Sequence, residues 1–422
     1  MTAERSLVEV IASAEPASIA LVQGDRRVTY GELSDLMVRT AGGIVQRGGV
    51  PGSRVAVAAP SAIDTVVAYL GVQAAGCISV MLNPRAPRPE LQQRLDMVDP
   101  ALVVLGGTQV ELPEGLAAYR PAGASGEGLE VLDETPAGGV QAMVRALAVG
   151  DNAASDGQRR REGLAPDDPA VVLFTSGVAG PPQGVVLTHR NLSAVQLGLV
   201  QQPDSGLDAS SVGLCVLPLA HVFGLNSMLG TMLRAGASVV VADGFDAEAT
   251  LELVKQHQVT VLTAVPQMWA AWAGLEGARS DALSSVLRAT SSAAHLPIST
   301  AAEMFDRFGV RVAAGYGLTE TAGTIVLDDL TDPVPGTVGR PLGETEIRLV
   351  DVDGHAVDEG DPGEIWVRGP SVFGSYSGGG PVIRSMLSPG GWCRTGDVGV
   401  FDEDGRLSVV DRLKDVIIVG GF

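Results

Sequence analysis

The stretch AVVLFTSGVAGPPQGVV, residues 170–186, joins a run of apolar residues to a loop of glycine, serine, threonine and proline. A short apolar run bounded by turn residues indicates a buried strand. A glycine-rich turn after such a strand exposes consecutive backbone N–H groups, which form a concave anion site without needing basic side chains. Because the spacing matches neither G-x-x-x-x-G-K-[ST] nor G-x-G-x-x-G, this stretch alone indicates either another kind of phosphate loop or a structural turn.

Working outward, similar apolar runs begin near residues 54, 77, 101, 212, 237, 259 and 310, and many are separated by stretches with helical patterning. This alternation predicts an α/β fold of stacked, mostly parallel sheets flanked by helices. From about residue 336, short strands alternate with Gly and Asp turns, as in GVFDEDGRLSVVDR, which predicts a small antiparallel, barrel-like subdomain. The expected division is a first α/β subdomain over 1–168 with an irregular excursion over 107–168, a second over 169–335, a β subdomain over 336–411 and the start of a hinge over 412–422.

Composition narrows the possible functions. The formal net charge of −20 disfavours a surface that neutralises nucleic-acid phosphates. No stretch approaches the roughly 18 to 20 apolar residues that span a bilayer, and the start of the chain lacks the pattern of a secretory signal. Because Cys77, Cys215 and Cys393 are far apart and the five histidines show no paired spacing, we expect no disulfide framework and no structural or transition-metal site. A cytoplasmic location is expected.

Four later stretches accompany the glycine-rich loop: LPLAHVFGL from 217, GYGLTET from 315, GWCRTGDVGVFDEDGRL from 391 and DRLKDVIIVGGF from 411. Together with the loop, and with VTYGELS from 28 and AYLGVQAAGCISVMLNPRAP from 68, they resemble the adenylate-forming superfamily, which includes acyl-CoA synthetases. The resemblance runs in order across most of the chain. It implies attack of a substrate carboxylate on the α-phosphorus of ATP, release of pyrophosphate, and capture of the resulting acyl-adenylate by a thiol, usually that of CoA.

The resemblance also implies roles for single residues. Glu320 would be a ligand of Mg²⁺, for which a hard oxygen donor is suited, Thr319 would contact the α-phosphate, and His221 would lie near the carboxylate. Tyr316 would face adenine, and Asp397 and Arg412 would bind the ribose. The other implied nucleotide-binding residues are Thr175, Ser176, Gly177, Gly180, Gly184 and Gly317.

Structural alternatives to these roles stay open at this stage. Tyr316 could be a core residue, Asp397 a turn former and Arg412 half of a surface ion pair. His221 could be a packed histidine.

The implied acyl pocket is apolar and has no buried cation, which suits a hydrocarbon or aryl carboxylate. No aspartate stands in LPLAHVFGLNS to receive an amino group, so an amino-acid substrate is disfavoured. The stretch SSAAHLP from 291 departs from the more glycine-rich family version through Ser292 and His295, which could narrow the tunnel or alter adenine contacts. The residues that the resemblance places along this pocket are Val222, Phe223, Gly224, Val265, Trp269, Ser292, Ala293 and Gly315.

Two features depart from the family pattern. The loop has Val178, Ala179 and Gln183 where the family has small hydroxyl residues and a lysine. Since one hydrogen bond to a charged group contributes about 1.5 to 3 kcal/mol, weaker binding of the β- and γ-phosphates is expected. Family members also continue into a mobile lid, whereas Lys414 here lies at the hinge position near the end of the sequence. We therefore expect the N-terminal portion of a longer enzyme, poorly active by itself.

Three functional hypotheses follow. The first is an acyl-CoA synthetase that uses ATP, Mg²⁺ and CoA to activate an apolar, fatty or related, carboxylic acid. The second is an acyl-AMP ligase that donates the acyl group to a carrier protein. The third, prompted by the altered loop, is a non-catalytic module that binds an acyl-nucleotide.

Overall fold

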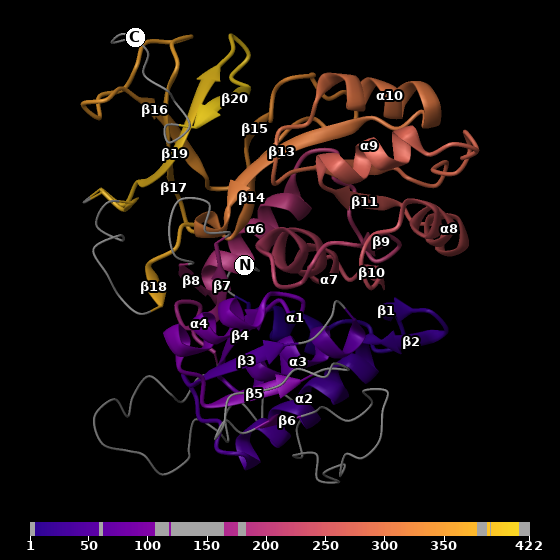
Figure 1. The fold of residues 1–422 in the computed structure, drawn as a ribbon, viewed down its shortest axis with the longest axis vertical. Coiled ribbons are helices and arrows are strands. Elements are labelled where there is room, and N and C mark those ends of the chain that lie inside the picture. The colour runs from indigo at the N-terminus through magenta and orange to yellow at the C-terminus, as the bar shows by residue number, and fades with distance from the viewer. Residues whose placement is uncertain are drawn as a thin grey trace.

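The computed structural model describes residues 5–58, 62–105, 118–119, 164–175, 183–377, 386–388 and 390–412 of the 422-residue chain. Within these residues the strands form three sheets, and helices cover the two larger ones (Figure 1). The indigo and purple part of the ribbon holds one large sheet, the magenta to orange part mostly the other, and the yellow part the small third sheet.

The largest sheet has nine strands in the order β15-β14-β13-β12-β11-β9-β10-β1-β2. Its central strands are parallel, and the pairing at each edge is antiparallel, β1 with β2 at one edge and β13 with β14 and β14 with β15 at the other. The strands are β1 (Ile19–Gln23), β2 (Arg26–Thr29), β9 (Val212–Cys215), β10 (Ser238–Val241), β11 (Val261–Ala264), β12 (Arg288–Ser291), β13 (Val312–Leu318), β14 (Gly323–Leu327) and β15 (Arg340–Pro341).

The second sheet has seven strands in the order β18-β8-β7-β4-β3-β5-β6. β7 and β8 form an antiparallel hairpin around the glycine-rich loop, and β18 joins the sheet by antiparallel pairing with β8. The strands are β3 (Arg54–Ala58), β4 (Ile78–Leu82), β5 (Leu102–Leu105), β6 (Ala118–Tyr119), β7 (Pro169–Phe174), β8 (Gly184–Thr188) and β18 (Ser375–Ser377).

Parallel strands need crossover connections, and helices supply most of them here. α3 is buried on nearly every side, as expected for a helix that is apolar all round. Gly71 of α3 lets α2 approach, because a Cβ there would lie 2.5 Å from Cγ2 of Thr40. The helices are α1 (Leu7–Ala12), α2 (Tyr30–Gln46), α3 (Ile63–Ala74), α4 (Arg88–Val98), α6 (His189–Gln201), α7 (Thr231–Arg234), α8 (Ala247–His257), α9 (Pro266–Gly274) and α10 (Ile298–Phe308), with a π-helix η2 (Phe223–Gly230) and a 3-10 turn η3 (Thr319–Thr321).

The third sheet is antiparallel, in the order β16-β17-β19-β20, and its strands are β16 (Glu346–Val350), β17 (Gly363–Arg368), β19 (Cys393–Phe401) and β20 (Leu407–Arg412). Apart from its last residue, Arg412, it lies within the expected 336–411 segment, and the predicted fold class is confirmed. The two larger sheets do not follow the other expected subdomain boundaries. β1 and β2 join the nine-stranded sheet, whereas β18 joins the seven-stranded one, because strand pairing brings together segments far apart in the chain.

Apolar side chains from all three sheets share the largest core, which includes Val57 of β3, Val239 of β10 and Ile365 of β17. A second core lies between the nine-stranded sheet and helices α8, α9 and α10. Among the described residues, we find no helix with both the length and the apolar character needed to cross a membrane.

Candidate active site

The centre of the candidate site is the tight turn between β13 and β14, which carries the GYGLTET motif. A Cβ built on Gly317 would lie 1.9 Å from the carbonyl oxygen of Gly323, so a larger residue would force the backbone apart. Gly323 has a φ of 126°, a conformation that favours glycine. The two glycines therefore hold the strands close together and set the position of η3, which carries the half-buried Thr319 and the buried Glu320.

Tyr316 connects this turn to the four-stranded sheet. Its hydroxyl donates to Oδ2 of Asp397 on β19 at 2.7 Å, and both side chains are buried. Burial, and next the Asp397 carboxylate, raise the pKa of Tyr316, so the phenol keeps its proton at neutral pH. Asp397 is paired in register with Arg412 of β20, whose side chain lies outside the described part of the chain. The side-chain hydrogen bond and the strand pairing thus connect Tyr316, Asp397 and the backbone of Arg412, three predicted nucleotide-binding residues.

Glu320 is held from another side by the segment 371–377. The Tyr376 hydroxyl donates to Oε1 of Glu320 at 3.0 Å, and the N–H of Phe373 donates to the Glu320 carbonyl at 2.8 Å. Burial, and next the Glu320 carboxylate, raise the pKa of Tyr376. Tyr376 on β18 is paired with Val185 of β8, the strand that follows the glycine-rich loop. The candidate metal ligand therefore lies beside this strand.

The two ends of the glycine-rich loop are described. The N–H of Thr175 donates to the carbonyl of Gln183 at 3.0 Å, and the N–H of Gln183 donates to Oγ1 of Thr175 at 3.4 Å. Gly184 is buried, and a Cβ there would lie 3.1 Å from side-chain atoms of Ser377 and Val172. The predictions for Ser176, Gly177, Val178, Ala179, Gly180 and Lys414 lie outside the described residues.

His221 lies immediately before the π-helix η2. Its Nδ1 accepts a hydrogen bond from the N–H of Phe223 at 3.2 Å, which assigns the proton of the neutral imidazole to Nε2. The side chain is exposed. Gly224 is required by packing, because a Cβ there would lie 2.6 Å from the carbonyl oxygen of Pro218.

Two polar side chains of η2 reach the turn that carries Glu320. Asn226 is fully buried, and its Nδ2 donates to the carbonyl of Ala322 at 2.7 Å. Ser227 accepts at Oγ from the N–H of Thr324 at 2.9 Å. π-Helical turns are rare and frequently occur at functional sites. These bonds connect the His221 segment to the Glu320 turn.

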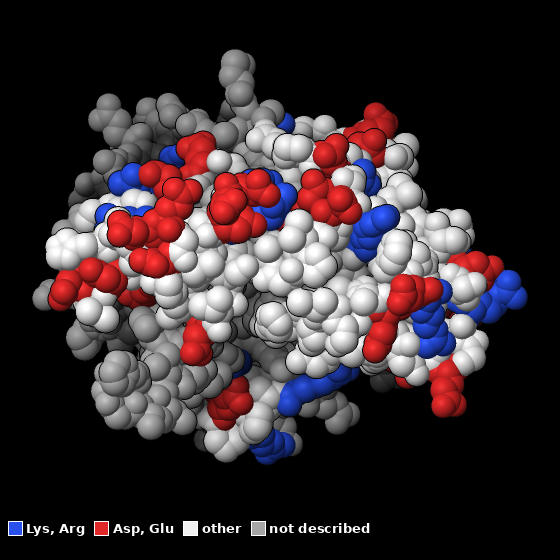
Figure 2. Space-filling model, turned by 90° about the horizontal axis from the view of Figure 1, so that it is seen from above, with Lys and Arg blue, Asp and Glu red and all other residues white. Residues whose placement is uncertain are grey.

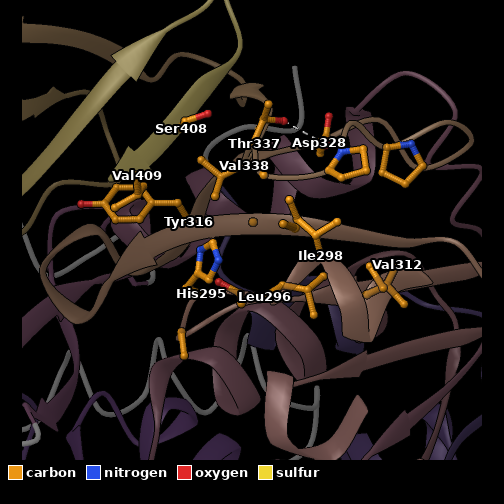
Figure 3. A pocket seen from close by; sticks show the side chains of 18 of the residues that line it. His295, Leu296, Ile298, Val312, Tyr316, Asp328, Thr337, Val338, Ser408 and Val409 are labelled. Atoms are coloured by element: carbon orange, nitrogen blue, oxygen red, sulfur yellow. Dashed lines mark hydrogen bonds between the residues drawn. The ribbon is translucent and has the colours of Figure 1, made fainter. Parts of the chain in front are cut away.

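A cavity of about 980 Å³ opens beside Tyr316 (Figure 3). The opposite wall comes from α10 and the segment 333–338, which Asp328 stabilises by accepting from the Thr337 hydroxyl at 3.1 Å. His295 lines the cavity on the Tyr316 side (Figure 3). Six predicted site residues line it: Ser292, Ala293, Gly315, Tyr316, Gly317 and Asp397.

The other predicted acyl-pocket residues do not line this cavity. Val222 and Phe223 are buried, in the first and second core respectively, and Val265 packs against the second core. Trp269 is fully buried and packs edge-on against Trp272, with ring centroids 5.1 Å apart. Its Nε1 has no hydrogen-bond partner. These side chains therefore contribute apolar packing behind the site.

Sequence reasoning did not single out Tyr376, Asn226, Ser227 or Asp328. Each makes its relevant contact with a residue distant in the chain or through a loop, and none belongs to a recognisable local pattern. The one weak signal is a tyrosine between serines in GSYSGGG, near the end of a strand.

Several known proteins are similar to this chain in sequence. A feruloyl-CoA synthase from an Amycolatopsis species is 33% identical over 409 residues, which cover 96% of this chain and 78% of that protein. The 4-coumarate–CoA ligase 5 of Oryza sativa subsp. japonica is 32% identical, with 94% of this chain and 72% of that protein covered.

Solved structures are similar as well. ATP-bound MatB from Rhodopseudomonas palustris superposes with a TM-score of 0.84 at 27% identity and covers 100% of this chain and 81% of its own. O-succinylbenzoate coenzyme A synthetase from Bacillus subtilis, in complex with ATP and magnesium ion, has a TM-score of 0.84 at 25% identity, covering 99% of this chain and 82% of its own. Residues 8–377 match the family described as AMP-binding enzyme, and the chain therefore belongs to this family.

Proposed function

We propose that this protein is an acid–thiol ligase that activates an apolar carboxylic acid with ATP and transfers the acyl group to CoA. The convergence of the Tyr316–Asp397 pair, Glu320 and the glycine-rich hairpin around the β13–β14 turn is the observation that carries the proposal. Relatives named as CoA ligases support the reaction class. A cytoplasmic location, where ATP and CoA are available, is part of the proposal.

In the first step a carboxylate oxygen forms a bond to the α-phosphorus while the bond to pyrophosphate breaks. Asp397 would accept from the ribose hydroxyls, and Tyr316 would hold the Asp397 carboxylate and offer its ring to adenine. Thr319 would donate its hydroxyl to the α-phosphate. Oriented donors of this kind stabilise the charge that builds on phosphoryl oxygens.

The carboxylate oxygens of Glu320 fit Mg²⁺, which prefers hard oxygen ligands. Magnesium would supply neutralisation of charge on the phosphates. Glu320 is 9% exposed and already accepts one hydrogen bond, so its carboxylate is ordered before ligand binding.

In the second step the thiolate sulfur of CoA attacks the acyl carbonyl and AMP leaves. Before the first step, the exposed imidazole of His221, with Nε2 as donor, would orient the carboxylate of the substrate acid. The apolar surroundings of the predicted acyl residues suit an aryl or hydrocarbon acid. Since the relatives named above are a feruloyl-CoA synthase and a 4-coumarate–CoA ligase, aromatic acids come before fatty acids as candidates.

The test is incubation of the full-length protein with ATP, Mg²⁺, CoA and single acids such as ferulate, 4-coumarate, benzoate, hexanoate or palmitate. We expect pyrophosphate release and a CoA thioester with at least one acid. Glu320→Gln should reduce the rate, whereas Glu359→Gln, at an exposed position between β16 and β17, should not.

Other results would overturn parts of the proposal. Pyrophosphate release without a CoA thioester would exclude CoA as acceptor and favour carrier-protein transfer. No pyrophosphate with any acid, despite nucleotide binding, would favour a binding module.

A further inference from the structure

Tyr376 lies between two parts of the candidate site that belong to different sheets. Its strand, β18, is hydrogen-bonded to β8 of the seven-stranded sheet, directly after the glycine-rich loop. Its hydroxyl reaches Glu320 in the turn between β13 and β14 of the nine-stranded sheet, at 3.0 Å from Oε1. A single hydrogen bond thus connects the strand beside the loop with the candidate metal ligand.

The phenol is held in place by packing. Tyr376 is 6% exposed, and its ring packs edge-on against Phe373, with centroids 4.7 Å apart. The N–H of Phe373 in turn donates to the backbone carbonyl of Glu320. Nδ2 of Asn191, at the start of α6, donates to the carbonyl of Val372 at 3.0 Å. The segment therefore holds both the backbone and the side chain of Glu320.

The hydroxyl has two neighbours that can accept its single proton. Oη of Tyr376 lies 2.7 Å from Sδ of Met386 as well as 3.0 Å from Oε1 of Glu320. A thioether is a weak acceptor, whereas a hydrogen bond to an ionised carboxylate is among the strong ones. The proton therefore points to Glu320, and this bond restricts rotation of the carboxylate.

We propose that Tyr376 is a positioning residue that sets the orientation of the Glu320 carboxylate for Mg²⁺ bound with the nucleotide polyphosphate. It acts through Glu320 and contacts neither metal nor nucleotide. The inference rests on the proposed function. Hydrogen-bond partners of metal-ligating side chains typically change metal affinity or activity by about 10- to 100-fold when removed.

Tyr376→Phe removes the hydroxyl and keeps the ring that packs on Phe373. Calorimetry should compare the binding of ATP with Mg²⁺, ATP with EDTA and AMP with EDTA, in wild type and variant. We expect the enhancement of ATP affinity by Mg²⁺ to fall about tenfold in the variant, with AMP affinity unchanged. AMP binding makes no use of the metal and reports whether the nucleotide site is intact.

Tyr30→Phe is the matched control, because the Tyr30 hydroxyl is also buried and donates to the Ala237 carbonyl at 2.8 Å, outside the site. It should leave the magnesium response unchanged. A double-mutant cycle adds a second measurement: in a Glu320→Gln background, Tyr376→Phe should cause little further loss, because the two residues act as one unit.

Three results would overturn the inference. An equal magnesium response in wild type and Tyr376→Phe would overturn it alone. Parallel loss of AMP affinity and of thermal stability would show a general structural role instead. A wild-type protein whose ATP affinity does not respond to Mg²⁺ would overturn both this inference and the proposed role of Glu320.

Discussion

At Gln183 the backbone and the side chain contribute differently to the site. Its N–H and carbonyl both pair with Thr175 and close the base of the glycine-rich loop, and any residue except proline could provide these groups. Its side chain, in contrast, stands at the position where the resemblance implies a lysine. The geometry of the loop base is therefore retained while a positive charge is missing.

Gln183→Lys should tighten the binding of ATP about 10- to 150-fold, because a hydrogen bond to a charged group contributes about 1.5 to 3 kcal/mol. The affinity for AMP, which lacks the β- and γ-phosphates, should change little. Calorimetry with both nucleotides measures the difference. Gln201→Lys makes the same charge change at an exposed position of α6 and serves as control. Equal ATP affinity in wild type and Gln183→Lys would remove the missing cation as an explanation for weak phosphate binding.

The Tyr316–Asp397 pair shows what residue types alone leave open. Both were predicted to contact the nucleotide, one through its ring and one through its carboxylate, with no connection between them. The structure joins them by a 2.7 Å hydrogen bond. An acceptor oriented by a buried phenol is preorganised, so it loses less conformational entropy when it binds the ribose.

Among the elements, α6 connects the glycine-rich hairpin to the rest of the site. The Thr188 side chain caps the helix, and the Asn191 side chain completes the capping box. Nδ2 of Asn191 also donates to the carbonyls of residues 370 and 372. His189, the first residue of the helix, is 4% exposed. Charging this imidazole in the folded protein is unfavourable because it would leave a cation without water at a helix N-terminus.

Burial lowers the pKa of His189 to about 4 in the folded protein, while an ordinary histidine titrates near 6.5. Between these pH values the unfolded chain binds more protons, so the free energy of unfolding should fall as pH drops from about 6.5 to about 4. The contribution of this group is about 3 kcal/mol over the window. His189→Gln should flatten the dependence, as measured by urea unfolding at several pH values. Identical slopes for variant and wild type would contradict the assignment.

The π-helix η2 is the element that sequence reasoning described least well. No π-helix was predicted there, and the chain enters one at Phe223, after a turn closed by the hydrogen bond from the N–H of His221 to the carbonyl of Pro218. The side chain of Asn226 contacts α6 and the β13–β14 turn at once, through Gln196 and Ala322. These contacts join segments about 30 and 96 residues away, and local propensity cannot reveal them.

At the scale of the whole molecule, the net charge of the surface is opposite to what an anionic ligand would need. Acidic and basic side chains are interspersed on the face seen in Figure 2, although acidic residues outnumber basic ones by 49 to 29 in the chain. A surface of this sign keeps proteins apart in solution. Binding of an anionic nucleotide then depends on local donors such as backbone N–H groups.

The shared core predicts cooperative unfolding. Leu70 of α3 is fully buried in the first core, whereas the four tryptophans, at 269, 272, 366 and 392, lie outside α3 and the seven-stranded sheet. Leu70→Ala should lower the free energy of unfolding by about 2 to 5 kcal/mol. Tryptophan fluorescence and circular dichroism should shift together. Leu287→Ala, at a 68% exposed leucine, should change stability by less than about 0.5 kcal/mol. An unshifted fluorescence transition in Leu70→Ala would show that the sheets unfold independently.

The sequence by itself determined the fold class, because apolar runs of strand length alternate with helical patterns and this periodicity survives in any context. It also determined the family, since the five ordered motifs carry residues whose spacing is local. Gly317 belongs to one of these motifs, although only the structure shows the close approach to the Gly323 carbonyl oxygen that requires a glycine there.

Tertiary structure alone decided which strand joins which sheet and which side chains meet. β1 pairs with β10, and β18 pairs with β8, across long stretches of chain. The contacts Tyr316–Asp397 and Tyr376–Glu320 join residues 81 and 56 positions apart. The physical reason is that hydrogen bonds and packing between distant segments form only when the whole core assembles, so no local pattern in the sequence records them.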